Sequence, residues 1–363
     1  YTPGDVIQTL VVMNAAALKV NIGDLEEGGI LIANADGFAK HNLRLAGCTT
    51  NPLEDGSLSK YRVFAVPIAT LAERAIDTSG LTRKEADRCK NFFALGLVCW
   101  LYERALEPTL QWLRQKFAAS PALLKANESA LQAGYSFGET TDLLPEQYHV
   151  EPAKLKPGLY RKIRGNEAIA LGLMAAAHRA GRPLFYSSYP ITPATDIFHE
   201  LARHEALGVK VFQAEDEIAA MCSVIGAAYG GAFAATGTSG PGLDLKIEAI
   251  GLAVMLELPC VIIDVQRGGP STGLPTKTEQ ADLLQVYAGR HGECPIPIIA
   301  PQLPSDCFVA AYEAFQIAVK YMTPVFVLSD AYLGNGAEPW HVPTVADLPP
   351  FSLRTDYPKE GFE

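Results

Sequence analysis

Four short segments of the sequence combine reactive side chains with glycine or proline. They contain carboxyl groups that can exchange protons, a guanidinium group that can bind a carboxylate through two hydrogen bonds, and hydroxyl groups that can donate. The segments are Tyr189-Pro190-Ile191-Thr192-Pro193, Glu215-Asp216-Glu217, Ser239-Gly240-Pro241-Gly242 and Arg267-Gly268-Gly269-Pro270. Together they could move a proton and hold a carboxylate.

Each of these segments follows a short apolar run and precedes a helical pattern. The runs, at 184–187, 209–213, 232–236 and 260–266, are short enough for strands, and apolar residues between them recur at helical spacing. Alternating strands and helices fold as a parallel sheet, because parallel neighbours need crossover connections. In such sheets ligands bind outside the carboxyl ends of the strands. The sequence therefore predicts an α/β fold in which all four segments line one crevice.

Glu217 differs from the two carboxylates before it. Glu215 and Asp216 open a helical pattern, where unsatisfied N–H groups and the helix dipole favour a carboxylate without any further role. Met221 and Ile225, four and eight residues after Glu217, place its carboxyl on an apolar stripe. A carboxyl that faces a core is harder to ionise, which suits proton exchange at neutral pH. We interpret Glu217 as a catalytic candidate.

Two interpretations of residues 189–193 stay open. Prolines keep the residues before them out of helical geometry, and Pro193 suits the first turn of the next helix. The segment can therefore be a rigid strand-to-helix turn in which Thr192 is the N-cap. In the functional interpretation the Thr192 hydroxyl points into the crevice.

The glycine-rich segment and the arginine also have alternatives. Ser239 and Gly240 could bind an anion through backbone N–H groups at a helix start, but the segment lacks the dinucleotide fingerprint and the phosphate-loop lysine and is more typical of a turn. Arg267 is either a surface cap or a bidentate clamp for a carboxylate. The long loop after it, with Thr276 and Lys277, is typical of a binding loop.

Composition argues against several classes of function. The net charge of −10 is unfavourable for nucleic-acid binding, which needs clustered Lys and Arg. The sequence shows no signal peptide and no apolar run of roughly eighteen residues, so we expect neither export nor a membrane span. Its seven cysteines are scattered without a Cys-x-x-Cys pair, which is typical of reduced thiols in a cytoplasmic protein and gives no metal-binding motif.

The length of 363 residues predicts more than one domain. Residues 1–142 alternate strand and helix patterns as a small α/β domain, and residues 143–162, rich in Pro, Glu and Lys, are interpreted as a linker. The catalytic α/β domain follows at 163–335, and the Pro-rich residues 336–363 are interpreted as an extended connector. The first residue is Tyr1 rather than Met, so processing or truncation could have removed an N-terminal segment.

A longer set of residues around the four segments matches one known family. The matching residues are Tyr189-Pro190-Ile191-Thr192-Pro193, Phe212-Gln213-Ala214-Glu215-Asp216-Glu217, those at 236–242, Gln266-Arg267 and Pro270-Ser271-Thr272-Gly273-Leu274-Pro275-Thr276-Lys277. They resemble the 2-oxoacid:ferredoxin oxidoreductase family, specifically the α subunit of the fused γ–α type, and the last run looks most like the 2-oxoglutarate branch. The resemblance is strong over residues 160–335. Residues 1–150 look like the later part of the family's γ domain.

This resemblance implies a fold and a reaction. The region 163–335 looks like a thiamine-diphosphate-type pyrimidine-binding domain, a parallel sheet with helices on both faces, next to a smaller γ-like α/β domain. Family members use thiamine diphosphate to decarboxylate a 2-oxoacid, pass electrons to iron–sulfur clusters and ferredoxin, and form an acyl-CoA from coenzyme A. For 2-oxoglutarate the products are succinyl-CoA, CO₂ and reduced ferredoxin, or the reverse carboxylation occurs.

The resemblance also implies roles for individual residues. Glu217 would hydrogen-bond the aminopyrimidine ring nitrogen and promote the tautomer that removes the thiazolium proton. Arg267 would clamp the substrate carboxylate, and Thr192 would hydrogen-bond the 2-oxoacid. Further contacts with the distal part of the substrate would come from Thr276 and Lys277. Further cofactor contacts would come from Pro190, Ile191, Ser239 and Gly240.

A partner is implied as well. The sequence has neither the Gly-Asp-Gly start of the metal–pyrophosphate motif nor clustered cysteines. By resemblance, a β subunit carries the pyrophosphate-binding domain with Mg²⁺ and a 4Fe-4S cluster, and we expect a dimer of α–β heterodimers. Two alternatives stay open: a pyruvate or other 2-oxoacid enzyme, and a non-catalytic scaffold or carboxylate-binding subunit.

Overall fold

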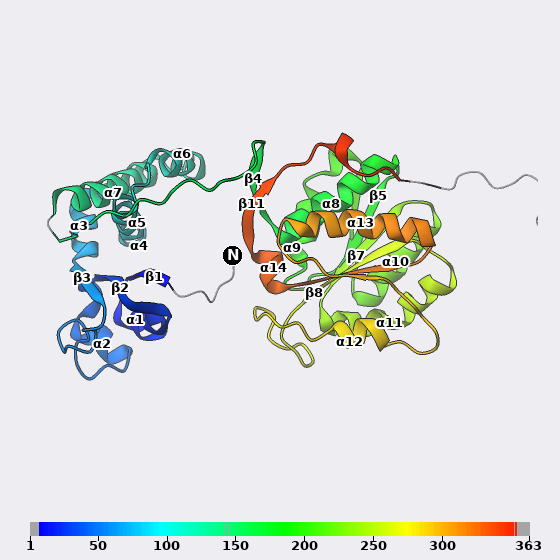
Figure 1. The fold of residues 1–363 in the computed structure, drawn as a ribbon, viewed down its shortest axis with the longest axis horizontal. Helices are drawn as coiled ribbons and strands as arrows, with labels where there is room; N and C mark the ends of the chain where they lie inside the picture. The colour runs from blue at the N-terminus through cyan, green and yellow to red at the C-terminus, as the bar shows by residue number, and fades with distance from the viewer. Residues whose placement is uncertain (1–6, 142, 145, 352, 354–363) are drawn as a thin grey trace, which may run out of the picture. The chain divides into compact units, whose positions relative to one another are not determined.

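The computed structural model describes residues 7–141, 143–144, 146–351 and 353. The chain divides into two compact units, Tyr1–Leu155 and Lys156–Glu363 (Figure 1). The start at Tyr1, the predicted domain boundary at 142, and residues 352 and 354–363 of the predicted connector lie outside the described residues. Within the described ranges, no helix is long and apolar enough to cross a membrane.

The first unit is a small α/β domain around a three-stranded parallel sheet of order β1-β2-β3. The strands are β1 (Ile7–Val12), β2 (Leu25–Asn34) and β3 (Arg62–Val66). The helices are α1 (Ala15–Asn21), α2 (Lys40–Leu45), α3 (Ile68–Ala75), α4 (Arg83–Arg88), α5 (Lys90–Leu101), α6 (Glu107–Lys116) and α7 (Pro121–Thr140). In β2, Ile30 and Ile32 pack in one apolar cluster, and Leu31 and Ala33 pack in another. Both faces of the sheet are therefore covered, as strict alternation along a strand requires.

The second unit contains a six-stranded parallel sheet of order β6-β5-β7-β8-β10-β9. Its strands are β5 (Leu184–Ser188), β6 (Val209–Gln213), β7 (Phe233–Thr238), β8 (Cys260–Gln266), β9 (Ile298–Ile299) and β10 (Val325–Asp330). Its helices are α8 (Gly165–Ala180), α9 (Thr195–Ala202), α10 (Glu217–Tyr229), α11 (Gly240–Met255), α12 (Leu283–Ala288), α13 (Asp306–Tyr321) and α14 (Ala331–Asn335). The strands predicted from the four apolar runs are confirmed.

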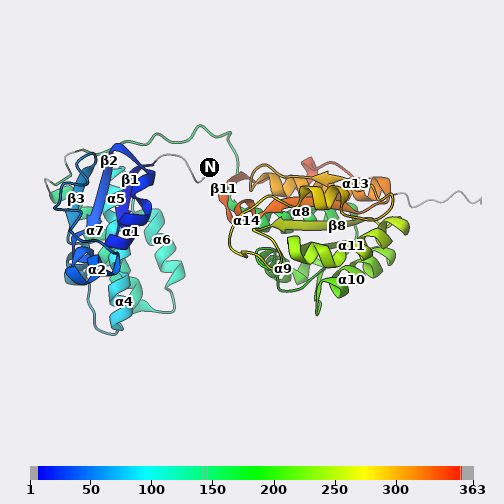
Figure 2. The same cartoon turned by 90° about the horizontal axis from the view of Figure 1, so that it is seen from below.

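Helices cover both faces of this sheet, as predicted. Along β8, Val261, Ile263 and Val265 belong to one apolar cluster with residues of α8 and α13, whereas Cys260 and Ile262 belong to another with residues of α10 and α11. Figure 2 shows α8 and α13 on one side of β8 and α10 and α11 on the other. Burial on both faces explains why β8 is a nearly continuous apolar run instead of an alternating one.

Two strands occur where the sequence predicts a linker and a connector. β4 (Tyr160–Arg164) pairs antiparallel with β11 (Ala337–His341). In β11, Glu338 and Trp340 are buried and their neighbours are exposed, so the strand has one inner face. Pro339 does not prevent pairing, because a proline is tolerated on an edge strand. The expectation of irregular chain is therefore wrong for these two strands; in β11 the proline masked a short alternating pattern.

Candidate active site

The four predicted segments lie at one edge of the six-stranded sheet. The strands that precede them are parallel neighbours in the order β6-β5-β7-β8, so their carboxyl ends face the same way. Tyr189 follows β5, Glu215 lies just beyond β6, Ser239 follows β7 and Arg267 follows β8. Strand direction thus gathers these residues at the edge where α/β sheets bind ligands.

Glu217 is the first residue of α10, and its side chain is half-buried. Asp216 is the N-cap, and its carboxylate accepts a hydrogen bond from Ala219 N at 2.8 Å. A capping role therefore accounts for Asp216. Met221 and Ile225 are buried, as the helical spacing predicts. Glu217 thus lies at the boundary between the apolar core and the sheet edge.

A pair of hydroxyl groups that sequence reasoning did not single out lies beside Glu217. Tyr189 Oη and Thr238 Oγ1 are hydrogen-bonded at 2.9 Å, and both residues are buried. A Cβ atom on Gly242 would lie 1.8 Å from Tyr189 Oη, 2.5 Å from Thr238 Oγ1 and 3.0 Å from Glu217 Cγ. These four residues therefore meet at one point, which leaves no room for a side chain at 242. Their positions in the sequence could have revealed the pair, since Tyr189 and Thr238 lie at the carboxyl ends of adjacent strands.

The phenol of Tyr189 is held in its neutral form. Burial raises the pKa of Tyr189, and the nearby Glu217 carboxylate raises it further, although the hydrogen bond with Thr238 acts in the opposite direction. At neutral pH the phenol therefore keeps its proton and can donate it in a hydrogen bond to a carboxylate or a ligand.

Arg267 is buried, with 6% of its surface exposed, so it is not a surface cap. Its guanidinium donates to the main-chain oxygen of Thr192 at 2.5 Å and to that of Thr272 at 2.8 Å. Its Nε is buried without a hydrogen-bond partner among the described residues. An arginine has about five N–H donors. Donors therefore remain that a ligand could use.

Thr192 is not the N-cap of the next helix. α9 begins at Thr195, and its N-cap is Ala194. The hydroxyl of Thr195 accepts a hydrogen bond from Ile191 N at 2.8 Å. Thr192 has an exposed side chain and precedes Pro193 through a cis peptide bond. The predicted capping role of Thr192 and first-turn role of Pro193 are wrong, because a residue before proline avoids helical geometry and the helix starts later.

The loop after Arg267 folds back on itself. Gly268 N donates to Lys277 O at 2.9 Å. Gly273 has a φ of +57°, and a Cβ there would lie 1.9 Å from Gly268 O, so this turn requires glycine. The side chains of Thr276 and Lys277 are exposed. Their contact with a substrate stays a prediction.

The start of α11 is an acidic environment. Ser239 is the N-cap, and its hydroxyl is buried without a hydrogen-bond partner in the described part of the chain. A Cβ on Gly240 would lie 2.8 Å from Asp282 Oδ2. A carboxyl group this close disfavours an anion at the helix start. Ser239 and Gly240 remain predicted cofactor contacts, but the geometry does not favour the anion-cradle interpretation.

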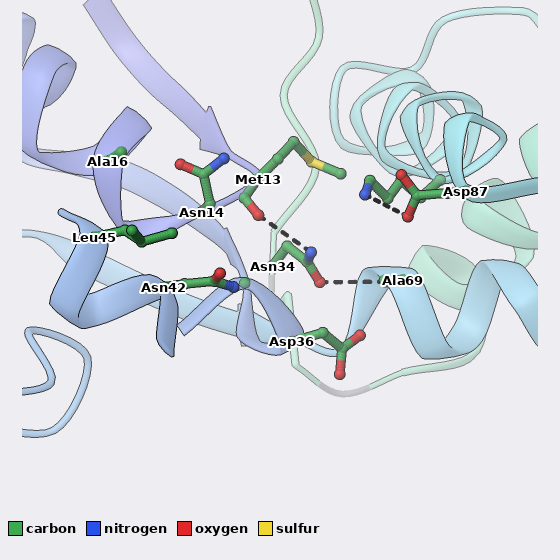
Figure 3. Close-up of a pocket in the computed structure, with 11 residues that line it drawn as sticks. Met13, Asn14, Ala16, Asn34, Asp36, Asn42, Leu45, Ala69 and Asp87 are labelled. Carbon is green, nitrogen blue, oxygen red and sulfur yellow. Dashed lines mark hydrogen bonds and ion pairs between the residues drawn. The ribbon is translucent and has the colours of Figure 1, made fainter. Parts of the chain in front are cut away.

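A separate cavity of about 390 Å³ lies in the first unit, beyond the carboxyl ends of β1 and β2 (Figure 3). Asn34 donates to Met13 O at 3.3 Å and accepts from Ala69 N at 3.2 Å. Lys90 forms an ion pair with Asp87 at 2.7 Å. These polar groups of its lining are engaged with the protein itself, and the lining contains none of the predicted site residues.

Two family models match the chain. The model described as pyruvate flavodoxin/ferredoxin oxidoreductase, thiamine diphosphate-binding, matches residues 176–362. The model described as pyruvate ferredoxin/flavodoxin oxidoreductase matches residues 1–137. The first match covers more than half of the chain and contains all four predicted segments.

Known proteins similar to the chain carry related names. The chain is 54% identical over 362 residues to 2-oxoglutarate oxidoreductase subunit KorA of Mycobacterium tuberculosis. The alignment covers 100% of this chain and 55% of the relative. It is 36% identical over 284 residues to subunit alpha of 2-oxoacid:ferredoxin oxidoreductase 1 of Aeropyrum pernix. That alignment covers 76% of this chain and 43% of the relative. The chain thus spans about half the length of the curated relatives it matches.

A solved structure is similar to the chain as well. It is the 2-oxoglutarate:ferredoxin oxidoreductase from Magnetococcus marinus with 2-oxoglutarate, coenzyme A and succinyl-CoA bound. The TM-score is 0.84 at 30% sequence identity, and the alignment covers 99% of this chain and 58% of that chain. The shared fold therefore extends over both units of the chain.

Proposed function

The chain belongs to the pyruvate flavodoxin/ferredoxin oxidoreductase family, and from this premise we propose that it supplies the α-subunit part of a thiamine-diphosphate-dependent 2-oxoglutarate:ferredoxin oxidoreductase. The enzyme converts 2-oxoglutarate and coenzyme A to succinyl-CoA and CO₂ and reduces ferredoxin, or it runs the reverse carboxylation. The observation that carries the proposal is the half-buried Glu217 beside the Tyr189–Thr238 hydroxyl pair, inside the region that the thiamine-diphosphate-binding model matches.

The names of two similar proteins support 2-oxoglutarate as the substrate. The relative from M. tuberculosis is named for 2-oxoglutarate, and the M. marinus structure has 2-oxoglutarate bound. Pyruvate is the second candidate, because the family models are named for it. The exposed Thr276 and Lys277 offer a hydroxyl and a cation for the second carboxylate, which pyruvate lacks.

The residues at the sheet edge fit the pyrimidine half of thiamine diphosphate. The Glu217 carboxyl can hydrogen-bond a ring nitrogen, and the Arg267 Nε and the Ser239 hydroxyl are buried polar groups that a ligand would satisfy. The remaining proposed cofactor contacts are Pro190, Ile191 and Gly240. When bound, thiamine diphosphate supplies the electron sink for decarboxylation of a 2-oxoacid.

Three side chains have distinct roles in this proposal. Glu217 exchanges a proton with the ring nitrogen of the cofactor. Arg267 binds the substrate carboxylate through N–H groups that are not bonded to the main chain, and the Thr192 hydroxyl donates to the 2-oxo group. Because Arg267 also holds the main-chain oxygen of Thr192, one side chain sets the position of both substrate contacts.

A β subunit is proposed to complete the site. The curated relatives are named as subunits, which supports a partner. We assign the pyrophosphate-binding domain, Mg²⁺ and the 4Fe-4S cluster to this subunit, with ferredoxin as electron acceptor and a dimer of α–β heterodimers as the assembly. Exposed apolar side chains on α10 and α11 offer a surface for the partner. They are Ile218, Tyr229, Leu245, Leu252 and Met255.

The cysteines support a reducing compartment, which we propose is the cytoplasm. Each of the seven cysteines of the sequence is unpaired in the structure. Proteins that fold in oxidising compartments more often carry disulfides, and free thiols are typical of the cytoplasm.

Isotope exchange between CO₂ and 2-oxoacids tests the proposal. The chain, together with its β subunit and thiamine diphosphate, is expected to incorporate labelled CO₂ into 2-oxoglutarate in preference to pyruvate. Glu217→Gln should lower the rate by about 10²-fold or more. Glu215→Gln is the matched control, because Glu215 is an exposed carboxylate two residues earlier, and it should leave the rate unchanged. Exchange into pyruvate alone would mean that pyruvate, and not 2-oxoglutarate, is the substrate. Exchange at the full wild-type rate in Glu217→Gln would favour the scaffold alternative.

A further inference from the structure

Lys246 is a buried lysine to which the proposed reaction gives no role. It lies in α11 with 0% of its surface exposed. An ammonium group taken out of water is unfavourable unless it is paired or hydrogen-bonded, so lysine is almost never fully buried without partners. A methionine would fill similar space without that penalty. The charge at this position therefore needs an explanation beyond packing.

The ammonium of Lys246 joins three parts of the candidate site. Nζ donates to the main-chain oxygen of Glu217 at 2.9 Å and to the hydroxyl of Thr236 at 3.3 Å. It also lies 5.0 Å from the ring centroid of Tyr189, within the range of a cation–π interaction. One side chain of α11 thus contacts the first residue of α10, a residue of β7 and the segment after β5.

Titratable groups of α10 and of the segment after β5 face this ammonium. Burial lowers the pKa of Lys246 to about 8, while Glu217, Asp216 and Cys222, all in or beside α10, oppose that shift. The Tyr189 phenol faces it from the segment after β5 and is neutral, because burial raises the pKa of Tyr189. Lys246 is therefore charged near neutral pH and loses its proton as the pH rises through about 8.

We propose that Lys246 is a positioning residue for Glu217. Its ammonium holds the start of α10 and the ring of Tyr189 together, so that the Glu217 carboxyl is aimed at the ligand. Lys246 touches no reacting atom. The inference rests on the proposed function, because that function assigns Glu217 to the cofactor.

Three variants separate positioning from packing. Lys246→Met keeps the approximate length and removes the charge, whereas Lys246→Arg keeps a charge that does not titrate. Lys320→Met is the matched control, because Lys320 in α13 also lies 5.0 Å from a tyrosine ring, that of Tyr321, but is exposed. Amide hydrogen exchange is measured on the chain without cofactor. The affinity for thiamine diphosphate is measured by calorimetry across pH on the complex with the β subunit.

Lys246→Met should speed amide exchange in the first turn of α10 and weaken cofactor binding, each by about tenfold or more, because a hydrogen bond from a charged donor is lost. In the wild type the cofactor affinity should fall as the pH rises through about 8. The affinity of Lys246→Met should show no such fall with pH. The affinity of Lys246→Arg should be within a few-fold of that of the wild type and should also show no fall with pH. Lys320→Met should match the wild type in every measurement.

Unchanged exchange in α10 of Lys246→Met, or a cofactor affinity of the wild type that does not vary between about pH 7 and pH 9, would overturn the proposal. If Lys246→Met does not fold, Lys246→Arg and the wild-type pH profile still decide it. Because the exchange measurement needs no cofactor, the two proposals can fail separately. A wild-type complex that binds no thiamine diphosphate overturns the proposed function, whereas normal binding by Lys246→Met overturns only the role of Lys246.

Discussion

The guanidinium of Arg267 donates a hydrogen bond to the main-chain oxygen of Thr192, 75 positions earlier in the sequence. A second bond, to the main-chain oxygen of Thr272, ties the same side chain to the loop that carries Thr276 and Lys277. One buried arginine therefore sets the geometry of both segments that contain the proposed substrate contacts. This role is additional to the proposed clamp, and the buried position of Arg267 excludes the surface cap that the residue type also allows.

Arg267→Lys is expected to lower kcat/KM for the 2-oxoacid by roughly 100-fold, because one ammonium cannot reproduce the planar fork that reaches two main-chain oxygens. Steady-state kinetics of the complex with the β subunit measures this. Arg203→Lys is the control, since Arg203 forms an exposed ion pair with Glu200 at 2.8 Å, and such pairs contribute little. Equal activity of Arg267→Lys and Arg203→Lys would show that the bonds to the main chain do not matter for the reaction.

Gly242→Ala is expected to destabilise the protein by about 1–3 kcal/mol, because the added Cβ overlaps a packed group. That Cβ would lie 1.8 Å from Tyr189 Oη. Gly251 is in the same helix, and a Cβ there has nothing within 4 Å, so Gly251→Ala should stabilise by roughly 0.5–1 kcal/mol instead. Urea unfolding of the two variants should therefore shift in opposite directions. If both substitutions stabilised the protein, Tyr189 would be able to move away from the added Cβ without a cost in stability.

The parts of this structure that the sequence predicts are those encoded by local patterns. Strands β5 to β8 follow from short apolar runs, because burial on both faces of a parallel sheet requires such runs. The half-buried position of Glu217 follows from its spacing to Met221 and Ile225, because residues four and eight positions apart lie on the same face of a helix. The gathering of the four segments at one edge follows from the direction of parallel strands.

The parts that the sequence does not predict depend on contacts between distant residues or on competing local preferences. Lys246 reaches Glu217 across 29 positions and Tyr189 reaches Thr238 across 49, and both contacts depend on strand order and helix packing. Threonine favours the N-cap position, but at Thr192 the following proline disfavours helical geometry, and the helix starts later. Pattern alone therefore locates the site and misses the side chains that hold its geometry.

Asp264→Asn is expected to increase stability near pH 7 and to change it little near pH 4. Asp264 in β8 is fully buried, and its pKa is raised by burial and by the neighbouring Asp282. The folded state therefore binds a proton that the unfolded state releases, so the stability that this carboxyl contributes is present at low pH and is lost as the pH rises. Urea midpoints at the two pH values measure the difference.

Glu248→Gln is the control for Asp264→Asn, because Glu248 is an exposed carboxylate of α11. Its effect should be small at both pH values, since exposed charges contribute little. If Asp264→Asn had the same effect at both pH values, the carboxyl would be ionised to the same extent in the folded and unfolded chains.

The stability of Lys246→Met relative to the wild type is expected to decline with rising pH. Burial lowers the pKa of Lys246 from 10.5 to about 8, so the unfolded chain binds more protons than the folded one between these values. The unfavourable burial of the charge is complete below about pH 8 and absent above about pH 10.5, so the free energy of unfolding of the variant relative to that of the wild type should fall by up to about 3 kcal/mol over that range. Urea unfolding across this window measures the change, with Lys320→Met as the variant whose difference from the wild type should stay constant. A constant difference for Lys246→Met would mean that the ammonium keeps its proton in the folded protein, and the acidic groups of α10 would then outweigh the effect of burial.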